Sequence, residues 1–157
     1  MTKLASAFGE KYQQSAANIR TKSFDLGGHL FKVRVPLSKE VEEMNARIEV
    51  VDEDALEARF QKIAEPFFRD RDGVEGIEIL DSDVLVDGKS CKDLAKSALQ
   101  VEQRMVEYVK LLVVENGNLG DISYADIDAE FPFQIQVELI SKITEAIQPG
   151  YKEARKN

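Results

Sequence analysis

The chain has 157 residues and a mass of 17.7 kDa, which is enough for one domain with its own hydrophobic core. Its 21 basic and 29 acidic residues give a net charge of −8, so the chain as a whole repels phosphate backbones and anionic lipid, and neither nucleic acid nor a membrane is expected as a partner. One Cys and one His exclude a disulfide framework and a zinc site made of Cys and His, and they fit a reducing compartment.

The start of the sequence predicts a helix and then a β-hairpin. The helix, over residues 1–20, is weak and frayed. Gly27 and Gly28 can take the positive φ angles of a two-residue hairpin turn, and this turn pairs Leu26 with His29. The hairpin then has one apolar face, and its opposite face carries Asp25, Lys32 and Arg34.

Two helices and a pair of short strands are expected next. Ser38 is suited to cap the first helix, whose N-terminal end is acidic. The second helix runs from about Asp54. Its apolar stripe consists of Leu56, Phe60, Ile63 and Phe67. Residues 74–86 contain two β-rich runs, which predict a second short hairpin or an isolated strand pair.

The longest helix is expected over about 91–115. Ser90 and Asp93 form a pattern that resembles a capping box at its start. Apolar residues at alternating spacings of four and three predict a seam of the heptad type, made of Leu94, Ala98, Val101, Met105, Tyr108 and Leu112. Toward residue 115 this helix becomes apolar nearly all round, so we expect that end to be buried.

The last elements are a short helix and a longer one. Ser123 and Asp126 repeat the capping pattern, and Pro132 opens a helix over 133–147. One apolar row of that helix consists of Phe133, Val137, Ile140 and Ile147, and the other of Ile135, Leu139 and Ile143. The fold class is therefore α+β and predominantly helical, with an N-terminal hairpin followed by a compact bundle of about five helices.

Charge is distributed unevenly along the chain. Residues 1–36 carry six basic and two acidic side chains, residues 37–148 carry twelve and 26, and residues 149–157 carry three and one. A basic start can attract the acidic body of another copy, so we expect weak homo-oligomers. We also expect a single domain over residues 1–148, followed by a basic, flexible tail. The longest strongly apolar run has four residues, far fewer than the roughly 20 that span a bilayer, which favours a cytoplasmic protein.

Residues that carry chemistry in enzymes are few and isolated. The hairpin places His29 beside the turn, with no sign of a catalytic role. Cys91 would lie in the first turn of a helix, where N–H groups favour a thiolate, but no second Cys or neighbouring His completes a site. Asp81, Asp83 and Asp87 resemble the start of a calcium loop that lacks its glycine and its last carboxylate, so turns are the better interpretation. We predict no catalytic residue, cofactor or metal, and hence a non-enzymatic protein.

The order of these elements resembles that of a known family. The features that carry the resemblance are the Gly-Gly hairpin, an acidic helix after Pro36-Leu37-Ser38, and a late helix pair with the sequence ISYADIDAEFPFQIQVELISKITEAIQ. Together, over roughly residues 20–148, they resemble the tail assembly chaperones of long-tailed, non-contractile bacteriophages.

The resemblance implies a factor that binds the helical tape-measure protein and recruits tail-tube subunits during virion morphogenesis. Such a factor works in the cytoplasm of the infected host cell and is absent from the finished virion. Many members of the family are also made in a longer form by ribosomal frameshifting.

The partner-binding residues that we expect are Val137, Ile140 and Ile147 on the last helix, with Lys32 and Arg34 on the hairpin. The alternative function is a small oligomeric structural or adaptor module, such as a phage tail-completion or head–tail connector protein.

Overall fold

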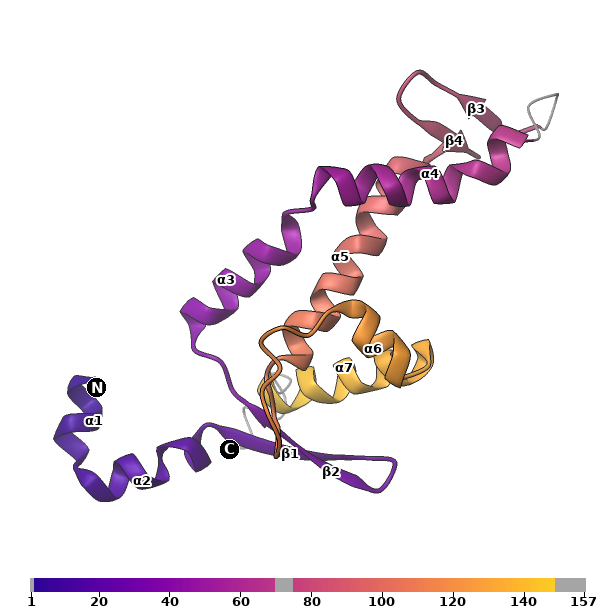
Figure 1. The fold of residues 1–157 in the computed structure, drawn as a ribbon. Coiled ribbons are helices and arrows are strands. Elements are labelled where there is room, and N and C mark those ends of the chain that lie inside the picture. The colour runs from indigo at the N-terminus through magenta and orange to yellow at the C-terminus, as the bar shows by residue number, and fades with distance from the viewer. Residues whose placement is uncertain (1, 70–74, 149–157) are drawn as a thin grey trace. The chain divides into compact units, whose positions relative to one another are not determined.

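The computed structural model describes residues 2–69 and 75–148 (Figure 1). Over these residues the fold is α+β and mostly helical, as predicted, with seven helices and two small antiparallel sheets. Five of the seven helices follow the N-terminal hairpin, and a second short hairpin is present as well. None of these helices combines the length and the apolar character that crossing a bilayer requires.

The chain forms two compact units. Unit 1 contains Met1–Glu42 and Met105–Asn157, and unit 2 contains Glu43–Arg104. Each unit is described by itself below. The single domain over residues 1–148 stays a prediction, and the predicted tail over 149–157 lies outside the described residues.

The N-terminal arm of unit 1 consists of two helices, α1 (Lys3–Phe8) and α2 (Glu10–Ile19), where the sequence predicted one. Gly9 separates them because its φ of +88° is a conformation that other residues rarely adopt. The Gly9 amide donates to the carbonyl of Ala5 and ends α1. Neither helix has a buried residue.

The first sheet has the strand order β1-β2-β6, and its hairpin has the predicted register. Leu26 at the end of β1 (Thr21–Leu26) pairs with His29 at the start of β2 (His29–Arg34). Gly27 and Gly28 form the turn with φ angles of +61° and +85°.

The third strand corrects the predicted extent of the longest helix. Helix α5 ends at Val109 instead of residue 115, and the next residues form β6 (Leu112–Val113) against β2. The Arg34 amide also donates to the Leu111 carbonyl, at 2.8 Å. The apolar segment that we expected to form a buried helix end therefore forms a strand. Val113 is β-branched and favours a strand, and the edge of β2 is available to pair with it.

Two helices complete unit 1, and both begin where predicted. In α6 (Tyr124–Glu130) the Ser123 amide donates to the Asp126 carboxylate at 2.9 Å, which closes the predicted capping box. Pro132 precedes α7 (Phe133–Ile147), which packs on β1 and β2. The row that contains Leu139 and Ile143 is the buried one.

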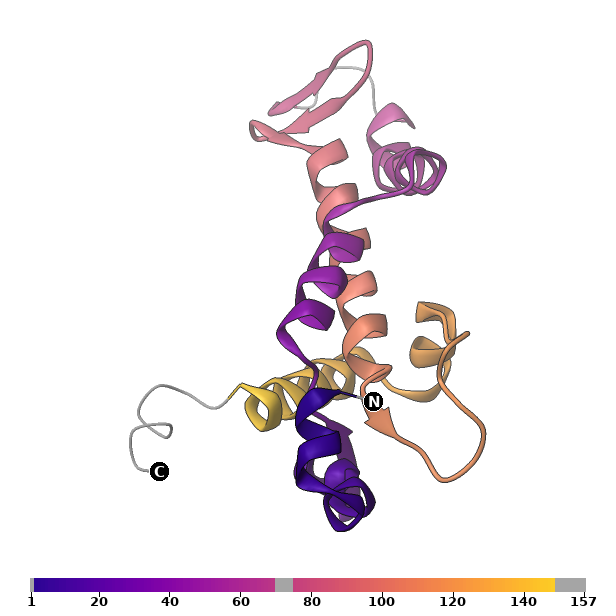
Figure 2. The same ribbon diagram turned by 90° about the vertical axis from the view of Figure 1, so that its left-hand side faces the viewer.

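Unit 2 has its core between α4 (Glu53–Arg69), the second sheet and the start of α5 (Cys91–Val109). In Figure 2, α4 is seen end-on beside the first turns of α5, with the small sheet above them. That sheet contains β3 (Ile77–Ile79), β4 (Val84–Val86) and β5 (Lys89–Ser90) in this order. The buried side chains of this cluster are Phe60, Ala64, Val84, Cys91 and Ala95.

The first half of the predicted α5 seam is wrong. Leu94 and Val101 are 48% and 45% exposed, whereas Cys91 and Ala95 have no exposed surface. Which side of α5 is buried depends on where α4 and β4 contact it. The heptad spacing within the α5 segment does not indicate these contacts. The cap itself is as predicted, because the Ser90 hydroxyl accepts from the Asp93 amide at 3.1 Å.

Helix α3 (Ser38–Glu49) runs from one unit into the other along the chain. Ser38 is its first helical residue and not its cap, because the Leu37 carbonyl accepts the first helical bond, from Val41 at 3.0 Å. In unit 1 this helix contributes Glu40, whose carboxylate pairs with Arg20, just before β1, and with Arg34, the last residue of β2.

Candidate functional site

The first sheet of unit 1 has one covered face and one open face. Helix α7 packs on β1 and β2, and Val33 on that side is fully buried. The opposite side, which we call the outer sheet face, carries alternate residues of β2 and the Val113 side chain that pairs with Lys32. Leu30 and Val113 on this face are 58% and 50% exposed.

A groove of about 440 Å³ runs along part of the outer sheet face. It is lined by residues 29–32 of the hairpin and residues 112–116 after α5. Three of its side chains are large, apolar and exposed, namely Leu30, Val113 and Val114. We call this feature the hairpin groove, and its Lys32 is exposed beside the apolar residues.

A second hollow, of about 310 Å³, adjoins the hairpin groove through the shared residue Val113. Its other walls come from Ala16 and Ala17 of α2, from Thr21 of β1 and from two arginines. The two hollows therefore follow one another along the outer sheet face, from the hairpin turn to α2, with apolar side chains between charged ones.

Glu40 holds the two arginines at the end of this surface. Its carboxylate lies 2.7 Å from Nη1 of Arg34 and 3.3 Å from Nη2 of Arg20. The Arg34 hydrogen bond holds the pKa of Glu40 below its ordinary value, although desolvation opposes this shift. Arg34 thus forms an ion pair within its own unit, whereas the exposed Lys32 side chain is available to bind a partner.

The five residues predicted to bind a partner do not form one surface. Lys32 and Arg34 are on the outer sheet face, as the hairpin register predicts. Val137 lies on α7 and is 48% exposed, while Ile140 and Ile147 of the same predicted row are half-buried. Because α7 packs on the covered face of the sheet, Val137 is not part of the hairpin groove.

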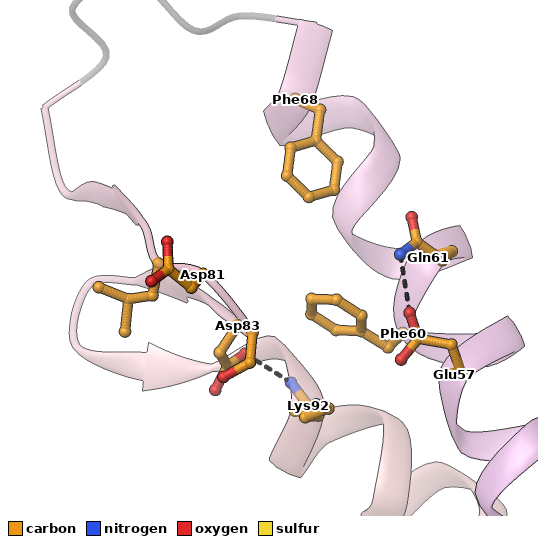
Figure 3. Close-up of a pocket in the computed structure, with 9 residues that line it drawn as sticks. Glu57, Phe60, Gln61, Phe68, Asp81, Asp83 and Lys92 are labelled. Atoms are coloured by element: carbon orange, nitrogen blue, oxygen red, sulfur yellow. Dashed lines mark hydrogen bonds between the residues drawn. The ribbon is translucent and has the colours of Figure 1, made fainter.

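Unit 2 has a separate pocket of about 320 Å³, bounded by α4, the loop between β3 and β4, and the first turn of α5 (Figure 3). Phe60 and Phe68 of α4 point toward the loop that carries Asp81 and Asp83. The ammonium group of Lys92 lies 5.7 Å from the centre of the Phe60 ring, a cation–π contact between two residues that line the pocket.

Asp83 is the organising residue of this pocket. Its carboxylate accepts from the Ser90 hydroxyl, from the Val84 amide at 2.7 Å and from the Lys92 amide at 3.1 Å. Desolvation raises the pKa of Asp83, but these hydrogen bonds and the Lys92 charge outweigh it and lower the pKa overall. The carboxylate is therefore used to fix the turn, as the sequence interpretation proposed.

The remaining candidates for chemistry are placed apart. His29 is exposed, and its ring meets the Phe31 ring edge-on with centroids 4.6 Å apart. Burial, with a contribution from the charge of Asp83, raises the pKa of the Cys91 thiol, which opposes the thiolate that its helix position would favour. Over residues 2–69 and 75–148, no group of three or more His, Cys, Asp or Glu side chains is placed to hold a metal ion.

The sequence interpretation missed the apolar residues of the hairpin groove. Val113 and Val114 were assigned to a buried helix end, and their exposure depends on the strand pairing with β2. Leu30 could have been identified from the sequence, because it is a large apolar residue on the otherwise polar face of the predicted hairpin.

No family model, curated protein or solved structure matches the chain.

Proposed function

We propose that this protein is a non-enzymatic tail assembly chaperone, which binds the helical tape-measure protein of a long-tailed phage and recruits tail-tube subunits to it. The observation that carries the proposal is the hairpin groove, where Leu30, Val113 and Val114 are exposed beside Lys32. The order of elements over residues 20–148, which resembles that family, supports it. The site of action is then the cytoplasm of the infected cell.

The hairpin groove has the properties that binding an amphipathic helix requires. Such a helix lays an apolar stripe into an apolar groove, and charged residues at the rim set its orientation. Here the apolar floor continues through Val113 into the second hollow, next to α2. Lys32 and Glu115 provide charges of opposite sign at the rim.

Co-expression with the tape-measure protein of the same genome tests this proposal. The wild-type chain should keep the tape-measure protein soluble and copurify with it. The double variant Leu30→Ser/Val113→Ser should fold and lose most of the client, because both side chains are at least half exposed and lie in the hairpin groove.

The matched control is Val50→Ser/Leu94→Ser, which removes two exposed apolar side chains of unit 2 and should retain the client. Equal loss in both double variants would count against the hairpin groove. If the wild-type chain never retains the client and is found instead at fixed stoichiometry in purified particles, the structural or adaptor module is the better assignment.

A further inference from the structure

The N-terminal arm, defined as α1 and α2, leaves its apolar side chains uncovered. Leu4, Phe8 and Ile19 are 66%, 59% and 60% exposed, and neither helix buries a residue. Leu4 and Phe8 are four residues apart and lie on one face of α1. The Phe8 ring packs edge-on against Tyr12, 4.9 Å between centroids, which gives the arm a formed apolar surface.

Helix α7 has a second uncovered apolar surface within the same unit. Phe133 and Val137 are 59% and 48% exposed, although Leu139 and Ile143 on the other side of the helix are buried. We call the row that contains Phe133 and Val137 the outward face of α7. Glu138 and Glu145 lie beside it and are exposed.

The two surfaces have opposite charge. Residues 2–22 carry four basic side chains and one acidic side chain, whereas residues 121–148 carry six acidic side chains and one basic. Lys3 and Lys11 are exposed next to the apolar residues of the arm. Neither these lysines nor the glutamates beside the outward face of α7 have an ion-pair partner in the part of the chain that the structure describes.

The arm and α7 of one molecule lie on opposite sides of the first sheet. Ala16 and Ala17 of α2 contribute to the hollow on the outer sheet face, with Arg34 and Val113. Helix α7 packs on the covered face instead. The arm therefore does not reach the outward face of α7 in its own chain.

We propose that the arm of one molecule docks on the outward face of α7 of a second copy of this chain. Leu4 and Phe8 then cover Phe133 and Val137, and the lysines of the arm meet Glu138 and Glu145. Because different surfaces meet, the contact is heterologous: the copy that supplies the arm retains a free α7 face, and the copy that supplies α7 retains a free arm, so further copies can add at both ends. This inference goes beyond the proposed function and does not depend on a client.

Charge reversal on the purified chain, with no client present, tests the proposal. Wild type should associate with rising concentration in sedimentation velocity, and salt should weaken the association. Lys3→Glu/Lys11→Glu and, separately, Glu138→Lys/Glu145→Lys should each weaken it about ten-fold, since two favourable pairs become repulsive.

A mixture of the two double variants gives the decisive measurement. The acidic arm of the first variant can then meet the basic α7 face of the second, and the basic arm of the second can meet the acidic α7 face of the first. The equimolar mixture should therefore recover association that neither variant shows alone. Lys62→Glu/Lys96→Glu in unit 2 changes the net charge as the arm variant does and should associate like wild type. Circular dichroism of each variant verifies that the fold is retained.

Three results would overturn the proposal: a wild-type chain that stays monomeric at all concentrations, charge-reversal variants that associate like the control, or a mixture of the two variants that fails to recover association. Any of them would leave the hairpin groove and the proposed function untouched, because the client experiment uses different residues.

Discussion

The hydroxyl of Tyr124 in α6 donates a hydrogen bond of 2.8 Å to the side-chain oxygen of Gln136 in α7. Gln136 is 1% exposed, and its nitrogen donates to Asp128 at 3.1 Å and to the Phe131 carbonyl at 2.8 Å. The buried amide is thus bonded at both ends, and it connects the two helices across the turn at Pro132.

Replacing Gln136 with Ala should destabilise unit 1 by about 2–3 kcal/mol, because three hydrogen bonds are lost and a cavity forms. Chemical denaturation measures this directly. Gln134→Ala is the control, since Gln134 is exposed on the same helix and its loss should cost less than about 0.5 kcal/mol. Equal effects of the two substitutions would contradict the structural role of Gln136.

Val137→Asp and Ile140→Asp should differ in stability, although both residues belong to the same predicted apolar row. Val137 is 48% exposed and should tolerate the charge, whereas Ile140 is half-buried and should lose about 2 kcal/mol or more from an unpaired carboxylate. Thermal unfolding followed by circular dichroism distinguishes them. An unfolded Val137→Asp protein would show that the outward face of α7 is core.

Asp83→Ala should cost unit 2 about 2 kcal/mol at neutral pH, because the carboxylate accepts three hydrogen bonds. The folded-state pKa of Asp83 is lowered, so this contribution is complete above the unfolded-state pKa of about 3.9 and is lost as pH falls through the folded value. The urea unfolding curves of wild type and Asp83→Ala should therefore differ at pH 7 and coincide in strong acid. Asp81→Ala, at an exposed neighbour, should change little at either pH.

Cys91 should react with a thiol reagent only when unit 2 opens. The side chain has no exposed surface, and burial raises the pKa of its thiol. Labelling with iodoacetamide should be slow in buffer and fast in denaturant. Rapid labelling of the native protein would show that Cys91 is accessible and that the core of unit 2 is open at that position.

Local signals were sufficient for the features that neighbouring residues determine. Gly27 and Gly28 gave the hairpin and its register, and Pro132 gave the start of α7. The capping patterns at Ser90 and Ser123 marked true helix starts. Each of these depends on backbone geometry within a few residues, which the sequence states directly.

Features that depend on distant partners could not be obtained in the same way. Leu112 and Val113 form a strand because β2 lies beside them, and nothing in their own segment indicates that partner. Cys91 and Ala95 are buried because α4 and β4 cover them, so a heptad count selected Leu94 and Val101 instead. Gly9 shows the limit of propensity, since the helical spacing continues through a residue that ends one helix and precedes the next.

The candidate site was predictable only in part, for the same reason. Lys32 could be placed on the open face from the hairpin register alone. The apolar wall at Val113 required the strand pairing, and the neighbouring hollow required α2 to lie against β1. Arg34 forms an ion pair with Glu40, so of the two predicted cations, Lys32 and Arg34, only Lys32 remains available. This pairing also depends on tertiary structure.

Unit 1 is assembled from both ends of the chain, with all of unit 2 between its two segments. During synthesis, the hairpin leaves the ribosome long before β6 and α7 exist, and two strands alone are only marginally stable. The ribosome will complete the segment of unit 2 while the apolar side of the hairpin, with Phe24 and Phe31, still has no helix to cover it. Truncated or stalled chains that end before α7 should therefore be the ones that aggregate in the cell.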